Sequence, residues 1–303
     1  MKFCLYIPVG NVTPGEFQSL DAVQEMTAAL ETAGIDGCCV TDHPAPASAW
    51  LHANGHDALD PFTALAFVAA HSRTLQLLTN IVVLPYRNPF ITAKAATTLQ
   101  VLSGGRFIMG IGSGYQKAEF EALGVDFHKR GKLTDEALET IREIWRGGRI
   151  VKRGMGFEAH GNEPRPAPEP APKIWIGGSS DKALQRAVVQ GDGWCPFFAI
   201  SHHSKLNQDS GIQSVADLQQ KIAWIAEQRE AQQRPAAFDV NIAISSTDNF
   251  TNRSRAEAER FLDEVAQLQE AGVNWVTVKL LHPDRRAYLD NVQWFSEEVV
   301  RKL

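Results

Sequence analysis

Short apolar runs alternate along this chain with longer segments in which apolar and polar residues follow a helical period. Several of the short runs are continuously apolar, which is typical of parallel strands buried on both faces. In the longer segments, apolar residues recur every three or four positions, as on one face of an amphipathic helix. The pattern predicts eight strands, at residues 3–9, 37–41, 75–80, 106–110, 173–176, 193–197, 238–244 and 275–280.

Local signals at the ends of the helical segments support this reading. The helix predicted over 21–33 stops at Gly34, a residue that suits the left-handed turn after a helix. The helix predicted over 284–302 begins at Asp284, a candidate N-cap, and residues 255–271 carry a similar apolar stripe. Eight strands, each followed by a helix, predict an α/β fold of the (β/α)8 TIM-barrel class. An open doubly wound sheet is the alternative, and the strand count disfavours it.

Two segments exceed a minimal barrel, one after the fourth helix and one after the sixth strand. Residues 147–172 contain Gly147-Gly148 and a proline-rich stretch, so we expect a polar insertion that is not helical. Residues 198–213 form a long connection that is either an active-site lid or a simple loop. We expect residues 1–303 to form one barrel domain.

Composition and charge narrow the function. A net charge of −5 argues against nucleic-acid binding, which needs a concentrated positive surface. No apolar run approaches the length of a membrane helix, and the first residues read as a strand, so a cytoplasmic protein is expected. The four cysteines lie in apolar runs without metal-binding spacing, which predicts buried free thiols, and the adjacent His202 and His203 do not suit a metal site. We therefore expect no metal.

In a barrel of this class the residues just after each strand surround the active site. Asp42 and His43 follow the second strand, where a carboxylate beside an imidazole could transfer protons near neutral pH or simply form a structural pair. Asn80 and the apolar run from Ile81 follow the third strand and could line a flat ring-binding surface or pack in the core.

Two small-residue turns follow the fourth and fifth strands. Gly112, Ser113, Gly114 and Tyr115 form a turn whose backbone amides could approach an anion or an aromatic ring. This turn lacks the third glycine of the dinucleotide fingerprint, so a Rossmann interpretation fails. Gly177, Gly178 and Ser179 precede a helix, where exposed amides could bind a phosphate, or Ser179 or Ser180 could cap the helix.

Taken in order, these strand ends resemble the bacterial luciferase-like superfamily of flavin- and deazaflavin-dependent barrels. Within it the chain is most similar to the branch that uses coenzyme F420, a 5-deazaflavin. The order and spacing match over about the first 200 residues, and the C-terminal third matches only in architecture. The stretches that carry the resemblance are residues 34–43, 78–88, 99–114, 173–181 and 191–194.

The resemblance implies roles for the residues named above. Asp42 and His43 would border the reactive face of the cofactor ring, with His43 as the proton partner. A cis peptide at Asn80–Ile81 would support the ring from behind. The turn formed by Gly112, Ser113 and Gly114 would border the cofactor tail, and the turn formed by Gly177, Gly178 and Ser179 would bind its phosphate. The resemblance also implies a small-molecule substrate and a homodimer.

The chain departs from the sugar-phosphate dehydrogenases of this branch in two places. Tyr115 replaces a glutamate after the glycine turn, and Ala47 replaces a tryptophan after the histidine, with Trp50 displaced. Glucose 6-phosphate is therefore disfavoured as the substrate. The favoured hypothesis is hydride transfer between coenzyme F420 and a small organic substrate. The alternatives are an FMN-dependent monooxygenase that uses reduced flavin and oxygen, and a barrel that binds a cofactor without catalysis.

Overall fold

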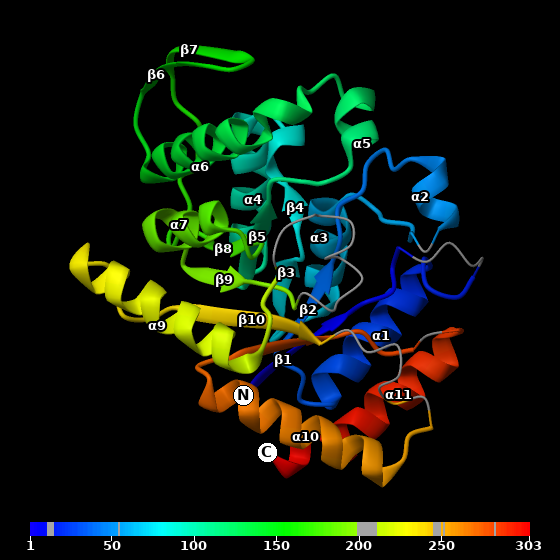
Figure 1. The fold of residues 1–303 in the computed structure, drawn as a ribbon. Helices are drawn as coiled ribbons and strands as arrows, with labels where there is room; N and C mark the ends of the chain where they lie inside the picture. The colour runs from blue at the N-terminus through cyan, green and yellow to red at the C-terminus, as the bar shows by residue number, and fades with distance from the viewer. Residues whose placement is uncertain (11–14, 54, 199–210, 245–249, 251, 282) are drawn as a thin grey trace.

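A closed barrel of parallel strands surrounded by helices forms the body of the protein (Figure 1). The computed structural model describes residues 1–10, 15–53, 55–198, 211–244, 250, 252–281 and 283–303. The main sheet has the strand order β3-β2-β1-β11-β10-β9-β8-β5-β4, and an additional pairing of β3 with β5 closes it. The predicted (β/α)8 barrel is confirmed, and the open sheet is excluded.

Each predicted strand is present with boundaries shifted by a few residues. The eight barrel strands are β1 (Lys2–Tyr6), β2 (Gly37–Val40), β3 (Gln76–Thr79), β5 (Phe107–Gly112), β8 (Lys173–Gly177), β9 (Gly193–Cys195), β10 (Asp239–Ile244) and β11 (Trp275–Val278). The short strand β4 (Val82–Val83) was not predicted, because it is a continuation of the apolar run after β3 that pairs with the end of β5.

Helices cover the outside of the barrel. Asp284 caps α11 by accepting a hydrogen bond from the backbone N–H of Ala287, as its position predicted. The helices are α1 (Leu20–Thr32), α2 (Ser48–His52), α3 (Pro61–His71), α4 (Pro89–Leu102), α5 (Lys117–Ala122), α6 (Arg130–Arg146), α7 (Asp181–Gln190), α9 (Val215–Ala231), α10 (Arg255–Glu270) and α11 (Arg285–Glu298), with 3-10 turns at η1 (Leu84–Tyr86), η2 (Phe127–Lys129) and η3 (Val300–Lys302).

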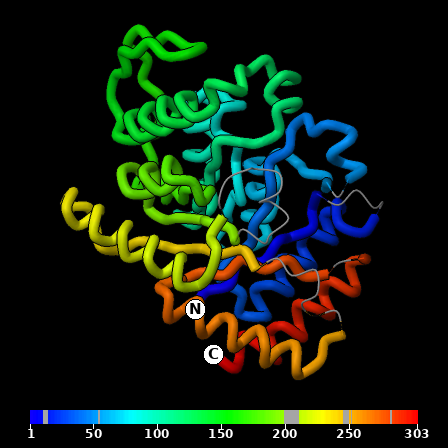
Figure 2. Tube along the Cα trace, in the orientation of Figure 1, coloured from blue at the N-terminus to red at the C-terminus, as the bar shows by residue number. Residues whose placement is uncertain are grey.

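The first and last strands of the chain lie side by side (Figure 2). Strand β1 pairs in parallel with β11, so that Cys4 lies opposite Thr277. On the helix-facing side of β1, the ring of Phe3 packs edge-on against Phe295 of α11, with ring centroids 5.3 Å apart. The barrel is thus closed by elements that are far apart in the sequence.

A small cluster of side chains, distinct from the main core, fills the barrel interior. It contains Cys4, Cys39, Leu78, Ile108, Trp175, Cys195 and Trp275, packed against Tyr6. Residues at alternate positions of the same strands, such as Phe3 and Val276, belong instead to the core that includes the helices. The four cysteines are free and buried, as their apolar neighbours predicted.

The insertion after α6 is a β-hairpin. Strands β6 (Ile150–Gly154) and β7 (Phe157–Asn162) pair antiparallel and project from the barrel near α6 (Figure 1). The prediction of a non-helical insertion at 147–172 is confirmed, although it missed the strands. The segment 198–213, for which a lid and a simple loop were both left open, falls largely outside the described residues, and so do His202 and His203.

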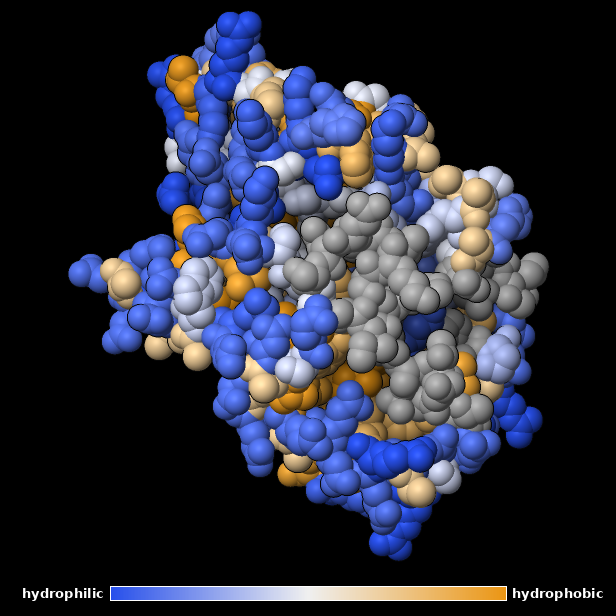
Figure 3. Space-filling model, in the orientation of Figure 1, coloured by the Kyte–Doolittle hydropathy of each residue, from blue (hydrophilic) through white to orange (hydrophobic). Residues whose placement is uncertain are grey.

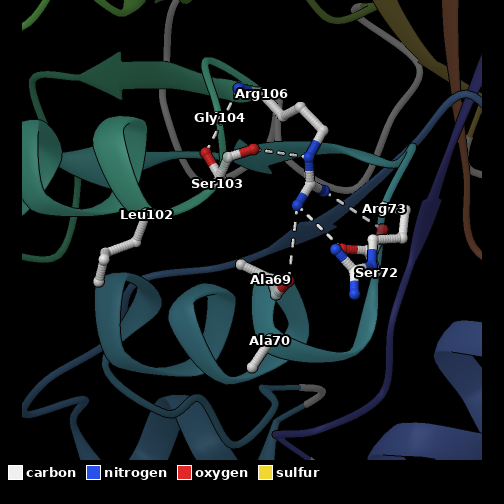
Figure 4. Close-up of a pocket in the computed structure, with 8 residues that line it drawn as sticks. All are labelled: Ala69, Ala70, Ser72, Arg73, Leu102, Ser103, Gly104 and Arg106. Carbon is white, nitrogen blue, oxygen red and sulfur yellow. Dashed lines mark hydrogen bonds between the residues drawn. The ribbon is translucent and has the colours of Figure 1, made fainter.

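Arg106 links the ends of α3 and α4 at the amino-terminal end of the barrel. Its guanidinium donates hydrogen bonds to the backbone oxygens of Ser103 and Ser72, at 2.7 and 3.0 Å (Figure 4). It also donates to the backbone oxygen of Leu75, at 2.7 Å. A cation that binds helix C-terminal carbonyls also opposes the negative end of each helix dipole. The hollow beside it, about 480 Å³, lies before β3 and β5, away from the carboxyl ends of the strands.

Candidate active site

His43 lies just after β2, at the carboxyl end of the barrel. Its Nδ1 atom lies 3.3 Å from Oε2 of Glu119 and 3.0 Å from Nε2 of Gln116. A protonated Nδ1 can donate to the Glu119 carboxylate, and an unprotonated Nδ1 can accept from the Gln116 amide. Nδ1 of His43 therefore has a hydrogen-bond partner whether or not it carries a proton.

Glu119 is fully buried in the short helix α5. Besides His43, its carboxylate accepts hydrogen bonds from the hydroxyl of Tyr86 at 3.0 Å and the backbone N–H of Ala45 at 3.2 Å. A buried carboxylate is retained in a protein only with such partners. Glu119 was not predicted as a site residue. In the sequence, Glu119 is a single acidic residue between Ala118 and Phe120, and this pattern is equally typical of an exposed position on a helix.

Aromatic rings surround the imidazole of His43. The ring centroid of Trp50 lies 4.5 Å away, that of His56 5.1 Å and that of Tyr115 6.2 Å. Trp50, on α2, is displaced in sequence from the family's tryptophan position, yet the fold places it against His43. Burial raises the pKa of Tyr115 to about 12, so its hydroxyl stays protonated near neutral pH.

Asp42 points away from this cluster. Its carboxylate accepts hydrogen bonds from the backbone N–H of Val83 at 3.1 Å and from Arg87 at 2.9 Å. Arg87 also donates to Asp60, at 2.9 Å. Burial raises the pKa of Asp42, and the neighbouring Arg87 lowers it, with a net rise. Through these contacts Asp42 holds the segment after Ile81 in place. The catalytic role predicted for Asp42 stays a prediction.

The peptide bond between Asn80 and Ile81 is cis, as the resemblance implied. The side-chain amide of Asn80 donates to the hydroxyl of Tyr6 at 2.9 Å. Two glycines accommodate the Ile81 side chain, since a Cβ on Gly112 would lie 2.0 Å from its Cδ1 atom and a Cβ on Gly177 would lie 3.0 Å from it. Ile81, Gly112 and Gly177 therefore meet at the mouth, and the apolar Ile81 side chain lies between the ends of β5 and β8.

The site predicted for the cofactor tail contains Ser113 and also Arg186, a cation that was not predicted from the sequence. Arg186 of α7 donates a hydrogen bond from Nη1 to the hydroxyl of Ser113 at 3.4 Å, and its Nε atom donates to Asp135 at 2.5 Å. The hydroxyl of Thr134 also donates to Ser113, at 3.0 Å. Gly114 has a positive φ of 77°, which glycine adopts without strain.

The turn before α7 is only partly available to a ligand. Ser180 caps the helix by accepting from the backbone N–H of Ala183, and the hydroxyl of Ser179 bonds to the backbone of Phe197. The backbone N–H of Gly178 donates to the carbonyl of Cys195 at 3.0 Å. Of the two predicted capping residues, Ser180 is therefore the one that caps the helix. Phosphate binding at Gly177, Gly178 and Ser179 stays a prediction.

Hydrophilic side chains dominate the molecular face shown in Figure 3. Within the described ranges, no helix is both long and apolar enough to span a bilayer. Across those same ranges, no group of three or more His, Cys, Asp or Glu side chains has the arrangement needed to hold a metal ion.

Comparison with known proteins shows the family. The family described as luciferase-like monooxygenase matches residues 1–298, and the chain belongs to it. One relative, the F420-dependent glucose-6-phosphate dehydrogenase of Amycolatopsis mediterranei, is 25% identical over 294 residues, which cover 88% of this chain and 84% of the relative. The chain is therefore a luciferase-like protein, and F420-dependent oxidoreductases are among its relatives.

Two solved structures share the fold. An F420-dependent secondary alcohol dehydrogenase, in complex with an F420–acetone adduct, superposes with a TM-score of 0.76 at 17% identity, covering 99% of this chain and 98% of that one. The monooxygenase RslO1 from Streptomyces bottropensis superposes with a TM-score of 0.75 at 18% identity, covering 100% and 99%. At these identities the likeness concerns the fold, which both deazaflavin enzymes and monooxygenases use.

Proposed function

We propose that this protein transfers a hydride between coenzyme F420 and a small organic substrate. The observation that carries the proposal is the position of His43, which has a partner for Nδ1 in either protonation state and lies at the same barrel mouth as Ile81. The similarity to an F420-dependent dehydrogenase supports a deazaflavin as the cofactor.

The residues at the mouth fit such a cofactor. Gly112 and Gly177 leave room for the Ile81 side chain, which offers an apolar support for a flat ring. Ser113, just after β5, and Arg186, on α7 and paired with Asp135, supply a hydroxyl and a guanidinium beside which an anionic tail would be held. A deazaflavin, when bound, supplies or accepts the hydride.

The residues of the chain position the substrate and move the coupled proton. His43 would exchange a proton with the substrate oxygen through Nε2, while Glu119 and Gln116 hold its Nδ1 side. Trp50 and Tyr115 pack around the imidazole, which restricts its orientation and excludes water from it. Glu119 does not border the mouth directly, since it is fully buried behind His43.

A cofactor titration tests the proposal. Purified protein would be titrated with F420 and, separately, with FMN, and binding would be followed by absorbance and fluorescence. We expect tighter binding of F420 and no oxygen consumption with reduced cofactor. Tighter binding of FMN with oxygen-dependent turnover would replace the proposal with the monooxygenase alternative.

Replacement of the histidine separates an enzyme from a cofactor-binding protein. In the His43→Asn variant we expect F420 binding to persist and substrate reduction, screened over small ketones, aldehydes and their alcohols, to fall by about 10²- to 10⁴-fold, the usual contribution of a general acid–base. Unchanged turnover would remove His43 from the mechanism.

We also propose that two copies of the chain pair through α3 and α4. These adjacent helices expose large apolar side chains: Phe67 is 44% exposed, Ile91 70% and Leu102 74%. An exposed apolar stripe of this kind is typical of an interface between copies. Sedimentation of the native chain should show a dimer, and an Ile91→Asp/Leu102→Asp variant should be a monomer. A native monomer would contradict the pairing.

A further inference from the structure

Lys279 follows the last barrel strand at a position whose side chain faces the interior. In β11, Trp275 belongs to the interior cluster, and Thr277 donates a hydrogen bond to the interior Asn241 at 2.9 Å. The residues between and after them, Val276, Val278 and Leu280, pack in the outer core with the helices. Because side chains of a strand alternate between its two faces, Lys279 is directed into the barrel mouth.

The strand order places Lys279 on the substrate side of that mouth. Around the closed barrel, only β1 separates β11 from β2, whose end carries His43. Strand β5, which carries Gly112 and Ser113 at its end, lies diametrically opposite β11 in the ring of eight. A cofactor tail held beside Ser113 would therefore be remote from Lys279, whereas a substrate that contacts His43 would lie between the two.

Among the described residues, nothing compensates the charge of Lys279. No carboxylate of the described residues forms an ion pair with it. Its side chain is exposed to solvent, yet desolvation by the surrounding protein lowers the pKa of its ammonium group. An exposed side chain with a lowered pKa is expected for a cation on a concave wall. A bound anion would replace the interactions with water that the ammonium group loses there.

The neighbouring side chain adds a neutral donor. Tyr6 ends β1, the strand beside β11, and packs against the interior cluster. Burial raises the pKa of Tyr6 well above its ordinary value, so its hydroxyl is neutral and does not compensate the charge of Lys279.

We propose that Lys279 is the anion-binding group of the substrate subsite, so that the substrate of this enzyme carries a carboxylate or a phosphate. This inference rests on the proposed function, because it takes the cofactor to occupy the side of the mouth near β5 and β8. It assigns the substrate to a chemical class, which the residues at the strand ends did not indicate.

The test uses the protein loaded with F420 and three variants. Inorganic phosphate and acetate would be titrated separately into each, with the deazaflavin absorbance and fluorescence as the readout. Lys279→Gln removes the charge, and Lys279→Arg keeps it. Lys302→Gln removes a lysine of η3, near the C-terminus, where it pairs with Glu298.

We expect Lys279→Gln to weaken anion binding by about tenfold or more, as the loss of a charge-assisted hydrogen bond does. Lys279→Arg should retain most of the affinity, Lys302→Gln should match the native protein, and all should bind F420 equally. A stronger response to phosphate than to acetate would assign a phosphorylated substrate, and the reverse a carboxylate.

Three results would overturn the proposal: no anion binding by the native holoprotein, equal binding by Lys279→Gln, or loss of F420 binding in that variant, which would make Lys279 a cofactor ligand. Failure of the native protein to bind F420 at all would instead contradict the proposed function. The two failures are therefore distinguishable.

Discussion

The Glu119 carboxylate lies 3.3 Å from Nδ1 of His43, although 76 residues separate the two along the chain. His43 follows β2 and Glu119 belongs to α5, after β5. The two meet because parallel strands of a barrel direct their carboxyl ends to one rim. This relationship gives the imidazole a fixed orientation, which a histidine on an unsupported loop would lack.

We expect Glu119 to act as a positioning residue for His43, and a neutral variant tests this. Glu119→Gln keeps the size of the side chain but removes its charge. We expect kcat to fall by about 10- to 100-fold, which is typical when a supporting contact of a catalytic group is lost. The F420 affinity should stay within a few-fold of native. The control is Glu121→Gln on the same helix, where Glu121 pairs with Lys117 at the surface. Equal kcat values for both variants would contradict the positioning role.

The contact between Ile81 and Gly112 can be tested by a compensating pair of substitutions. In Gly112→Ala, the new methyl group would meet Cδ1 of Ile81. We expect a loss of about 1–3 kcal/mol in the free energy of unfolding, as for other overpacked sites, and weaker cofactor binding. Ile81→Val removes Cδ1, so the double variant should recover part of both losses. Strictly additive effects in urea unfolding would show that the two residues are not in contact.

Arg87 compensates the buried charge of Asp42, so Arg87→Met should be destabilising. At pH 7 we expect a loss of about 3 kcal/mol, because an ionised carboxylate is left buried without its cation. Burial already raises the pKa of Asp42, and loss of Arg87 removes the group that lowers it. The penalty should therefore shrink as the pH falls and Asp42 is protonated. Addition of Asp42→Asn should rescue the variant at pH 7. A penalty independent of pH would contradict this account.

Glu31 makes stability depend on pH in acid. Although burial raises its pKa, hydrogen bonds from Thr74, Arg73 and Ser72 lower it from 4.5 to about 2. A carboxyl whose pKa is lower in the folded state stabilises the fold above its unfolded pKa. That stability is lost as the pH falls from 4.5 towards 2.

Glu31→Gln should lack this part of the acid transition. The native chain should therefore lose more unfolding free energy between pH 5 and pH 3 than the variant, measured by urea titration at each pH. Glu25→Gln, on the same helix and 54% exposed at its side chain, is the control and should follow the native curve. Parallel curves for the native chain and Glu31→Gln would exclude the contribution.

The sequence by itself determined the fold class and the strand ends that form the mouth. Continuous apolar runs such as 37–41 identify buried parallel strands without any knowledge of their neighbours, and the glycine after the helix at 21–33 marks where that helix ends. The cis peptide after Asn80 was implied by family resemblance and is confirmed. These features are local, or repeat with the period of one element, so a linear pattern records them.

Only the tertiary structure decided which polar side chains complete the site. Glu119 and Arg186 each occupy a position where a charged residue is ordinarily solvated, and nothing in the adjacent sequence distinguishes them. The same holds for Lys279, the residue that we propose for the substrate subsite. Trp50 is likewise displaced in sequence from the position of the family's tryptophan, but helix α2 brings its ring centroid to 4.5 Å from that of His43. Their roles depend on contacts between residues that closure of the barrel brings together, and the free energy of such contacts depends on burial and distance, which the order of residues does not specify.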